Sequence, residues 1–210
     1  NAVVRRLDES ALAAADVADR AVAAGSPVGL LHGVPVTVKE NIDVAGTPTT
    51  QAVVALAEAV SPMDAPLVER VRAAGAIPIG RTNLPDLGLR VTTESSLHGV
   101  THNPWHPNRT AGGSSGGEGS ALASGMSPLG FGNDIGGSLR NPATCCGITS
   151  IKPTTGVVPS ATMIVAERVG SGAHDGKPPE PLLRQTKLGL GAAGFELRLA
   201  TIRSGRLSPF

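Results

Sequence analysis

Two glycine-rich segments of this sequence hold serines that could act as nucleophiles. Residues 112–117 read GGSSGG, and residues 135–138 read IGGS. Glycines in a turn let successive backbone N–H groups converge on one point, which is the geometry of an oxyanion hole. A flexible linker is an alternative interpretation of the first segment. Neither turn contains the glycine pattern of a phosphate-binding loop, so nucleophilic chemistry is the more specific prediction.

A serine hydroxyl needs a base to become a nucleophile at neutral pH. The usual base is histidine, and His98, His102 and His106 are spaced four apart. Prolines at positions 104 and 107 break any helix that would bring these side chains onto one face, which argues against a metal site. A lysine can serve instead where burial lowers its pKa towards neutrality. Lys39 closes a run of alternating valines and is that candidate, although a lysine ending a strand is commonly only a solvated charge.

The segments around these residues alternate between strand and helix patterns. Residues 33–39 alternate valine with other residues, which predicts a strand ending at Lys39. Strands are also predicted over residues 77–80 and 127–132, and extended pieces over 148–151 and 155–158. Helices are predicted over residues 7–24, 51–60, 118–125 and 139–146, and from Asp64 as N-cap to Gly75. This order indicates an α/β fold with a parallel or mixed sheet.

Composition limits the class of protein. The 210 residues carry 18 Lys and Arg against 17 Asp and Glu, so the net charge of +1 gives no electrostatic case for binding nucleic acid. No apolar run reaches the length of a membrane span, and the first residues lack a signal-peptide pattern. The adjacent Cys145 and Cys146 disfavour a disulfide and are predicted to be small core residues. A cytoplasmic enzyme is therefore expected.

Five ordered segments resemble the motifs of the amidase signature family. They are GVPVTVKEN at 33–41, RTNLP at 81–85, NPW at 103–105, GGSSGGE at 112–118, and DIGGSLR at 134–140 with its continuation to Thr154. The resemblance implies an incomplete α/β/α sandwich around a mixed central sheet, formed by residues 1–164. It also implies hydrolysis of a carboxylic amide C–N bond in a small-molecule substrate, with no metal and no cofactor.

The resemblance carries the family's catalytic roles over to three residues. Ser138 is expected to attack the amide carbonyl carbon and form an acyl-enzyme. Ser114, which follows a cis peptide bond in the family, is expected to relay the proton of Ser138. Lys39 is expected to be the base that accepts this proton and to be neutral in the resting state.

The resemblance also assigns the residues around this triad. The backbone N–H groups expected to form the oxyanion hole are those of Ile135, Gly136, Gly137 and Ser138. The side chains expected to support the triad and its loops by hydrogen bonds are Ser115, Asp134 and Arg140, with Arg140 paired to Asp134. Asn133 stands where many relatives carry serine or threonine, so a contact that depends on a hydroxyl group is not expected there.

Residues 165–210 do not resemble the family. They form a poorly specified basic tail, and family members are substantially longer than this chain. The interpretation is a frameshifted or otherwise aberrant end, which would expose apolar surface and sheet edges and favour a homodimer. Two alternatives to an active amidase stay open: an inactive truncated remnant that serves as an interaction piece, and an A-type component of an amidotransferase.

Overall fold

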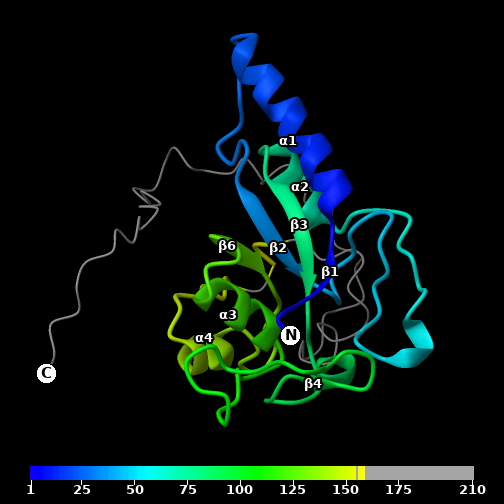
Figure 1. Cartoon of the computed structure of the whole chain (residues 1–210), viewed down its shortest axis with the longest axis vertical. Helices are drawn as coiled ribbons and strands as arrows, with labels where there is room; N and C mark the ends of the chain where they lie inside the picture. The colour runs from blue at the N-terminus through cyan, green and yellow to red at the C-terminus, as the bar shows by residue number, and fades with distance from the viewer. Residues whose placement is uncertain (155, 159–210) are drawn as a thin grey trace, which may run out of the picture. The chain divides into compact units, whose positions relative to one another are not determined.

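A mixed four-stranded sheet organises the fold. The computed structural model describes residues 1–154 and 156–158, and the strands of its main sheet lie in the order β1-β3-β2-β6 (Figure 1). β3 pairs antiparallel with β1, and β2 pairs parallel with both β3 and β6. The bounds of these strands are Val3–Arg6 (β1), Pro35–Lys39 (β2), Ile77–Thr82 (β3) and Leu129–Phe131 (β6). The mixed sheet of the expected α/β fold is therefore present.

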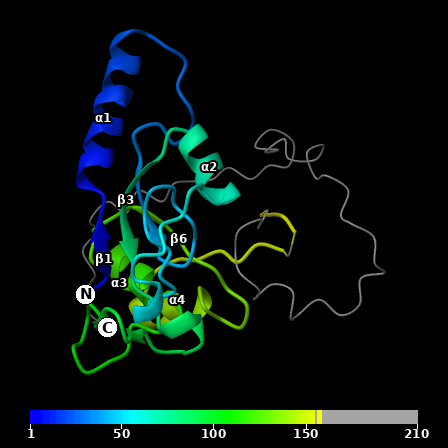
Figure 2. The same ribbon diagram turned by 90° about the vertical axis from the view of Figure 1, so that its right-hand side faces the viewer.

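Helices flank this sheet. Those of the described residues are α1 (Asp8–Ala23), α2 (Pro66–Ala73), α3 (Gly116–Ala123) and α4 (Arg140–Cys146), with the short 3₁₀ turns η1 (Val54–Leu56) and η2 (Asp86–Gly88). A small antiparallel pair, β4 (Glu94–Ser95) and β5 (Gly99–Val100), lies apart from the main sheet. α3 contacts all four strands of the main sheet and α4. α1 and α2 lie on different sides of the strands (Figure 2).

β2 presents two different faces. Val36 and Val38 are fully buried and pack in apolar clusters with valines of α2. Thr37 and Lys39 are equally buried but point to the opposite face, where the Thr37 hydroxyl donates a hydrogen bond to Glu118 of α3 (2.6 Å). Because side chains alternate along a strand, the valine pattern correctly predicted that Lys39 would lie on the face away from the valine core.

The helix predicted over residues 51–60 is wrong. Only the 3₁₀ turn η1 forms there. Gln51 and Ala52 have φ angles of 52° and 59°, in the left-handed region, so a right-handed helix cannot begin at them. The Thr50 hydroxyl accepts a hydrogen bond from the Ala52 N–H group (3.0 Å) and stabilises this turn.

The prediction that Asp64 caps α2 is also wrong. The helix begins at Pro66, and the N-cap residue is Ala65. The Asp64 carboxylate instead accepts a hydrogen bond from the Ala45 N–H group (2.7 Å) and pairs with Arg72 (3.0 Å). Asp64 therefore ties the loop after β2 to α2, and these two partners compete with the helix N-terminus for its oxygens.

The remaining element predictions differ from the structure in smaller ways. The strand at 127–132 is shortened to β6, the strand at 77–80 extends to Thr82, and β1 was not predicted. Residues 148–151 form no strand, because no neighbouring strand pairs with them in the described part of the chain. The extended piece at 155–158 lies partly, and the tail at 165–210 wholly, outside the described residues.

α1 leaves apolar side chains in contact with solvent. None of its residues is buried, and Leu12, Val17 and Val22 are 68%, 58% and 61% exposed. The exposed apolar surface expected from the sequence is therefore present on this helix. Within residues 1–154 and 156–158, no helix combines the length and the apolar character needed to cross a membrane.

Gly117 brings α3 against the backbone of residue 83. A Cβ atom added at Gly117 would lie 2.4 Å from the Asn83 nitrogen and 2.5 Å from its carbonyl oxygen. Gly117→Ala is therefore expected to lower the free energy of unfolding by about 3 kcal/mol, measured by urea denaturation. At Gly119 the nearest atoms are side-chain atoms of Pro142 and Cys146, at 3.1 and 3.2 Å, so Gly119→Ala should cost less than about 1 kcal/mol. Equal losses for the two variants would contradict this packing argument.

Candidate active site

Lys39 and Ser114 form the centre of the site. Lys39 is the last residue of β2 and is fully buried, and its Nζ atom lies 2.7 Å from Ser114 Oγ. Ser114 lies just before α3, and the Gly113–Ser114 peptide bond is cis, which confirms the sequence prediction. The face of β2 that carries Lys39 is the face on which α3 lies. Strand alternation and the glycine-rich turn together bring the amine and the hydroxyl into contact.

Ser138 lies in the turn between β6 and α4 and is partly buried. Its carbonyl oxygen accepts a hydrogen bond from the Ser115 N–H group (3.1 Å), which fastens this turn beside Ser114. The Ser115 hydroxyl donates to the Asn133 carbonyl oxygen (3.4 Å), so Ser115 supports the loop as predicted. The Ser138 hydroxyl makes no hydrogen bond to any residue that the structure describes.

Asp134 holds the turn that contains Ser138. Its carboxylate accepts hydrogen bonds from the N–H groups of Gly137 (2.7 Å) and Leu139 (3.0 Å) and forms two bonds with the Arg140 guanidinium (2.9 and 3.0 Å). The predicted Asp134–Arg140 pair is confirmed. Burial raises the pKa of Asp134, but the hydrogen bonds from Arg140 and the backbone outweigh it and hold that pKa well below its usual range. Asp134 is therefore a fixed charge around which the turn folds.

The expected oxyanion hole differs from the structure at one position. The Gly137 N–H group donates to Asp134, so it is not free to bind a substrate oxygen. Within the described part of the chain, the N–H groups of Ile135, Gly136 and Ser138 donate no hydrogen bond. Gly137 adopts a φ of 124°, which a side chain would disfavour, and this conformation lets its N–H group turn back to Asp134. Three of the four predicted donors remain available.

Asn133 contributes a contact that the sequence did not predict. Its Oδ1 atom lies 2.7 Å from Lys39 Nζ, and its Nδ2 atom donates to Asn41 Oδ1 (3.0 Å). No hydroxyl stands at this position, but an amide oxygen reaches the buried amine in its place. The only signal in the sequence was the departure from the family pattern at residue 133.

The sequence matches the family model described as Amidase over residues 1–176. The chain belongs to the amidase family. It is 52% identical over 160 residues to the indoleacetamide hydrolase of Bradyrhizobium diazoefficiens, covering 76% of this chain and 30% of that protein. It is 42% identical over 176 residues to an acylamidase of Rhodococcus erythropolis, covering 84% of this chain and 36% of that protein.

A third relative belongs to an amidotransferase. The chain is 46% identical over 158 residues to the A component of the glutamyl-tRNA(Gln) amidotransferase of Alkaliphilus metalliredigens, covering 75% of this chain and 32% of that protein. This amidase chain thus spans 30% to 36% of the length of the three relatives.

Solved structures agree with this family assignment. A bacterial aryl acylamidase of the amidase signature enzymes aligns with a TM-score of 0.64 and 34% identity, over 67% of this chain and 30% of that chain. The match supports the fold expected from the sequence, an incomplete α/β amidase-signature fold.

Burial sets the charge of the lysine in this amidase. Removal of water from around Lys39 lowers its pKa from 10.5 to about 7, while the negative charges of Glu118 and Asp134 raise it in part. Near neutral pH a substantial fraction of Lys39 is therefore an uncharged amine, which is the form that can accept a proton. The prediction that burial brings this lysine towards neutrality is confirmed.

Glu118 is a buried acid of α3 that was not predicted as a functional residue. Its two carboxyl oxygens accept hydrogen bonds from the hydroxyls of Thr37 (2.6 Å) and Thr82 (2.8 Å). Burial raises its pKa to about 7, and the threonine hydroxyls and Lys39 oppose this rise. The signal in the sequence was one acidic residue within a helix of glycine, alanine, serine and leucine. When ionised, Glu118 favours the charged form of Lys39.

Glu118→Gln is expected to lower the pKa of Lys39 further, by about one unit, because the variant lacks a negative charge that favours the ammonium form. The glutamine amide can still hydrogen-bond both threonine hydroxyls, so the fold should persist. The measurement is a pH titration of the Lys39 Cε chemical shift in protein that contains carbon-13 lysine. Glu9→Gln, on exposed α1, is the matched control. An unchanged Lys39 pKa in Glu118→Gln would contradict the electrostatic role.

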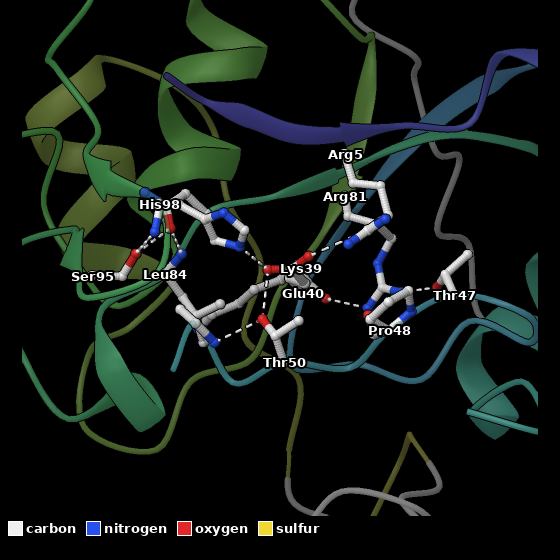
Figure 3. A network of polar contacts seen from close by, with 12 residues as sticks. Arg5, Lys39, Glu40, Thr47, Pro48, Thr50, Arg81, Leu84, Ser95 and His98 are labelled. Carbon is white, nitrogen blue, oxygen red and sulfur yellow. Dashed lines mark hydrogen bonds and ion pairs between the residues drawn. The ribbon is translucent and has the colours of Figure 1, made fainter. Parts of the chain in front are cut away.

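A second group of buried charges surrounds Glu40, the residue after Lys39 (Figure 3). The Glu40 carboxylate is fully buried, accepts a hydrogen bond from the Thr50 hydroxyl (2.7 Å) and lies 2.5 Å from His98 Nε2. The Arg5 guanidinium approaches the same carboxylate at 3.8 Å. His98, one of the three evenly spaced histidines, is therefore a partner of a carboxylate rather than of a serine.

Arg81 of β3 holds the backbone on both sides of Glu40. Its buried guanidinium donates to the carbonyl oxygens of Lys39 (3.4 Å) and Ile42 (2.5 Å) and to the Thr47 hydroxyl. Burial lowers the pKa of Arg81 to about 10, and the charge of Glu40 opposes this. Arg81 therefore stays charged at neutral pH and fixes the course of the chain where β2 ends.

The two cysteines are free thiols. Cys146 is buried, as predicted, and burial raises its pKa to about 11, which disfavours the reactive thiolate. Cys145 is only partly buried, because its position near the end of α4 faces away from the core. The Trp105 ring nitrogen donates to the Cys146 carbonyl oxygen (2.6 Å), so the NPW segment fastens the end of α4.

Proposed function

We propose that residues 1–164 carry the catalytic segment of a hydrolase that cleaves a carboxylic amide C–N bond through an acyl-enzyme. The observation that carries the proposal is the 2.7 Å contact between the buried Lys39 amine and the Ser114 hydroxyl, in a segment fastened to Ser138. A buried amine is costly, and apolar packing alone does not require one. An amine of lowered pKa against a hydroxyl is the arrangement that a base and its relay need.

In the proposed reaction Lys39 begins as a neutral amine. It accepts the Ser114 proton while Ser114 accepts the Ser138 proton, and the Ser138 oxygen forms a bond to the amide carbonyl carbon. For this step the Ser138 side chain turns towards Ser114. Such a rotation is reasonable, because catalytic hydrogen bonds often tighten only when substrate is bound.

The negative charge that develops on the carbonyl oxygen is stabilised by the free N–H groups of Ile135, Gly136 and Ser138. The proton then passes back through Ser114 to the leaving nitrogen, and the C–N bond breaks. The acyl group remains as an ester on Ser138. A water molecule attacks this ester with the same proton path, which releases the carboxylic acid and restores the serine hydroxyl.

The proposed substrate class is carboxylic amides. The relatives are named as an indoleacetamide hydrolase, an acylamidase and a component of an amidotransferase, and all of these names imply amide chemistry. The 46% identity to the amidotransferase component favours a second candidate, in which the same serine would act on a glutamine amide beside partner proteins.

Labelling with a fluorophosphonate tests the proposal. The probe reacts with a serine that a base activates, and mass spectrometry locates the adduct. We expect an adduct on Ser138 of the folded chain, together with ammonia release from indole-3-acetamide or glutamine or amine release from an anilide. Absence of both adduct and turnover, in protein that unfolds cooperatively by circular dichroism, would overturn the proposal and favour an inactive remnant.

A further inference from the structure

Asn133 and Asn41 form a pair of amides beside Lys39. The Asn133 Oδ1 atom is 2.7 Å from Lys39 Nζ, and the Asn133 Nδ2 atom donates to Asn41 Oδ1 (3.0 Å). The Lys39 amine therefore has two polar neighbours within hydrogen-bond distance, the Ser114 hydroxyl and the Asn133 amide oxygen. The amide pair reaches Lys39 from the turn after β6, whereas Ser114 reaches it from the turn before α3.

The two neighbours of the amine differ in what they can do. An amide oxygen only accepts hydrogen bonds, whereas a hydroxyl both donates and accepts. A neutral amine has two N–H bonds and one lone pair. With one N–H bond held by Asn133 Oδ1, the lone pair can face the Ser114 hydroxyl, whose proton it must accept. The acceptor thus favours the orientation of Lys39 that proton transfer needs.

Asn41 decides which end of the Asn133 amide faces the lysine. A reversed amide would present its NH₂ group to Lys39 and would compete with Ser114 for the lone pair. Asn41 Oδ1 accepts a hydrogen bond from the NH₂ group, and two oxygens facing each other would repel, so the reversed state is disfavoured.

We propose that Asn133 is a positioning residue that orients the Lys39 amine for proton transfer from Ser114, and that Asn41 holds the Asn133 amide in the required orientation. This inference rests on the proposed function, because it takes Lys39 as the base. A serine or threonine at this position could turn its hydroxyl proton towards the lysine, whereas the oxygen of a fixed amide cannot.

The charged groups around Lys39 define what a substitution should do. Glu118 acts on Lys39 from α3, and Asp134 acts from the turn after β6. The Arg81 guanidinium touches the Lys39 carbonyl oxygen, and the Glu40 carboxylate is occupied by Thr50, Arg5 and His98. Asn133 is a neutral member of this set. Asn133→Asp therefore adds a negative charge directly against the amine.

Asn133→Asp and Asn133→Leu are expected to move the pH profile in opposite directions. The aspartate should raise the pH midpoint of Ser138 labelling by about one unit or more, because a carboxylate favours the ammonium form. The leucine, of similar size but without an acceptor, should lower the midpoint and reduce the labelling rate at high pH by about tenfold or more. A purely structural role would reduce the rate equally at every pH and leave the midpoint in place.

Asn41→Ala provides a second test that leaves Asn133 in the chain. Release of the amide should reduce the labelling rate at high pH by about threefold, and Asn41→Asp, which keeps an acceptor for the NH₂ group, should restore most of that loss. Asn108→Asp is the matched control, because it adds the same charge at an exposed asparagine and should leave rate and midpoint unchanged.

The Lys39 Cε chemical shift separates the two proposals. Lys39 is one of four lysines, so its signal can be assigned with Lys39→Met and its pKa measured without any activity. If Ser138 is labelled but Asn133→Asp leaves both the midpoint and the Lys39 pKa unchanged, the positioning role is overturned and the proposed function stands. If the unsubstituted chain gives no Ser138 adduct, both are overturned.

Discussion

Ser138→Ala is expected to abolish the fluorophosphonate adduct and to reduce amide turnover to the uncatalysed rate. The Ser138 oxygen is the atom proposed to bond to the carbonyl carbon, and a methyl group cannot form that bond. Loss of a nucleophile that acts together with a base commonly lowers kcat by a factor on the order of 10⁶. The measurements are mass spectrometry of the labelled chain and detection of released ammonia or amine.

The fold of this variant should be intact. The Ser138 hydroxyl makes no hydrogen bond to the described residues, so its removal is expected to change the free energy of unfolding by less than about 0.5 kcal/mol. Ser124→Ala, at the exposed C-cap of α3, is the matched control and should label like the unsubstituted chain. Full labelling of Ser138→Ala at some other serine would mean that the nucleophile is assigned wrongly.

Lys39→Met is expected to lower the labelling rate of Ser138 by about 10³-fold and to remove its pH dependence near neutrality. Methionine fills nearly the same volume but carries no base. In the unsubstituted chain the pKa of Lys39 is about 7, so the neutral fraction and the labelling rate should both increase as pH rises through this value. Lys152→Met, at an exposed lysine, should leave the profile unchanged. A Lys39→Met profile that still rises near pH 7 would identify another base.

The same substitution should alter how stability depends on pH. In the unfolded chain Lys39 regains its ordinary pKa of 10.5, so between about pH 7 and 10.5 the unfolded chain binds a proton that the folded chain does not. The contribution of Lys39 to stability therefore increases with pH across this window and is least favourable below it, where a charged lysine must be buried. The difference in unfolding free energy between Lys39→Met and the unsubstituted chain should shrink as pH rises. A constant difference would contradict the lowered pKa.

The parts of the site that follow from local periodicity could be predicted from the sequence. Alternating valines place one face of β2 in an apolar core, and this alone requires Lys39 to point the other way. The resemblance of two glycine-rich turns to family motifs supplied Ser114 and Ser138. The cis bond before Ser114 and the Asp134–Arg140 pair were expected on the same basis and are present.

The parts that depend on long-range contacts or on unusual backbone angles could not be predicted. Gln51 and Ala52 belong to good helix-forming sequence, yet tertiary context places both in the left-handed region. The Gly137 N–H group was expected to face the substrate, but an aspartate three residues earlier in the chain binds it. The contact between Asn133 and Lys39 spans 94 positions, and no local pattern reports it.

The proposed base and the proposed nucleophile lie in parts of the fold that open with different ease. Lys39 belongs to β2, which has a hydrogen-bonded neighbour at each edge, so its backbone exchanges hydrogen only when the sheet separates. Ser138 belongs to a turn held by Asp134 and Arg140, and the Arg140 side chain is 59% exposed. High ionic strength screens such an exposed pair. Salt should therefore speed hydrogen exchange at residues 135–138 while residues 36–38 stay protected, so that activity is lost in a chain whose core remains folded.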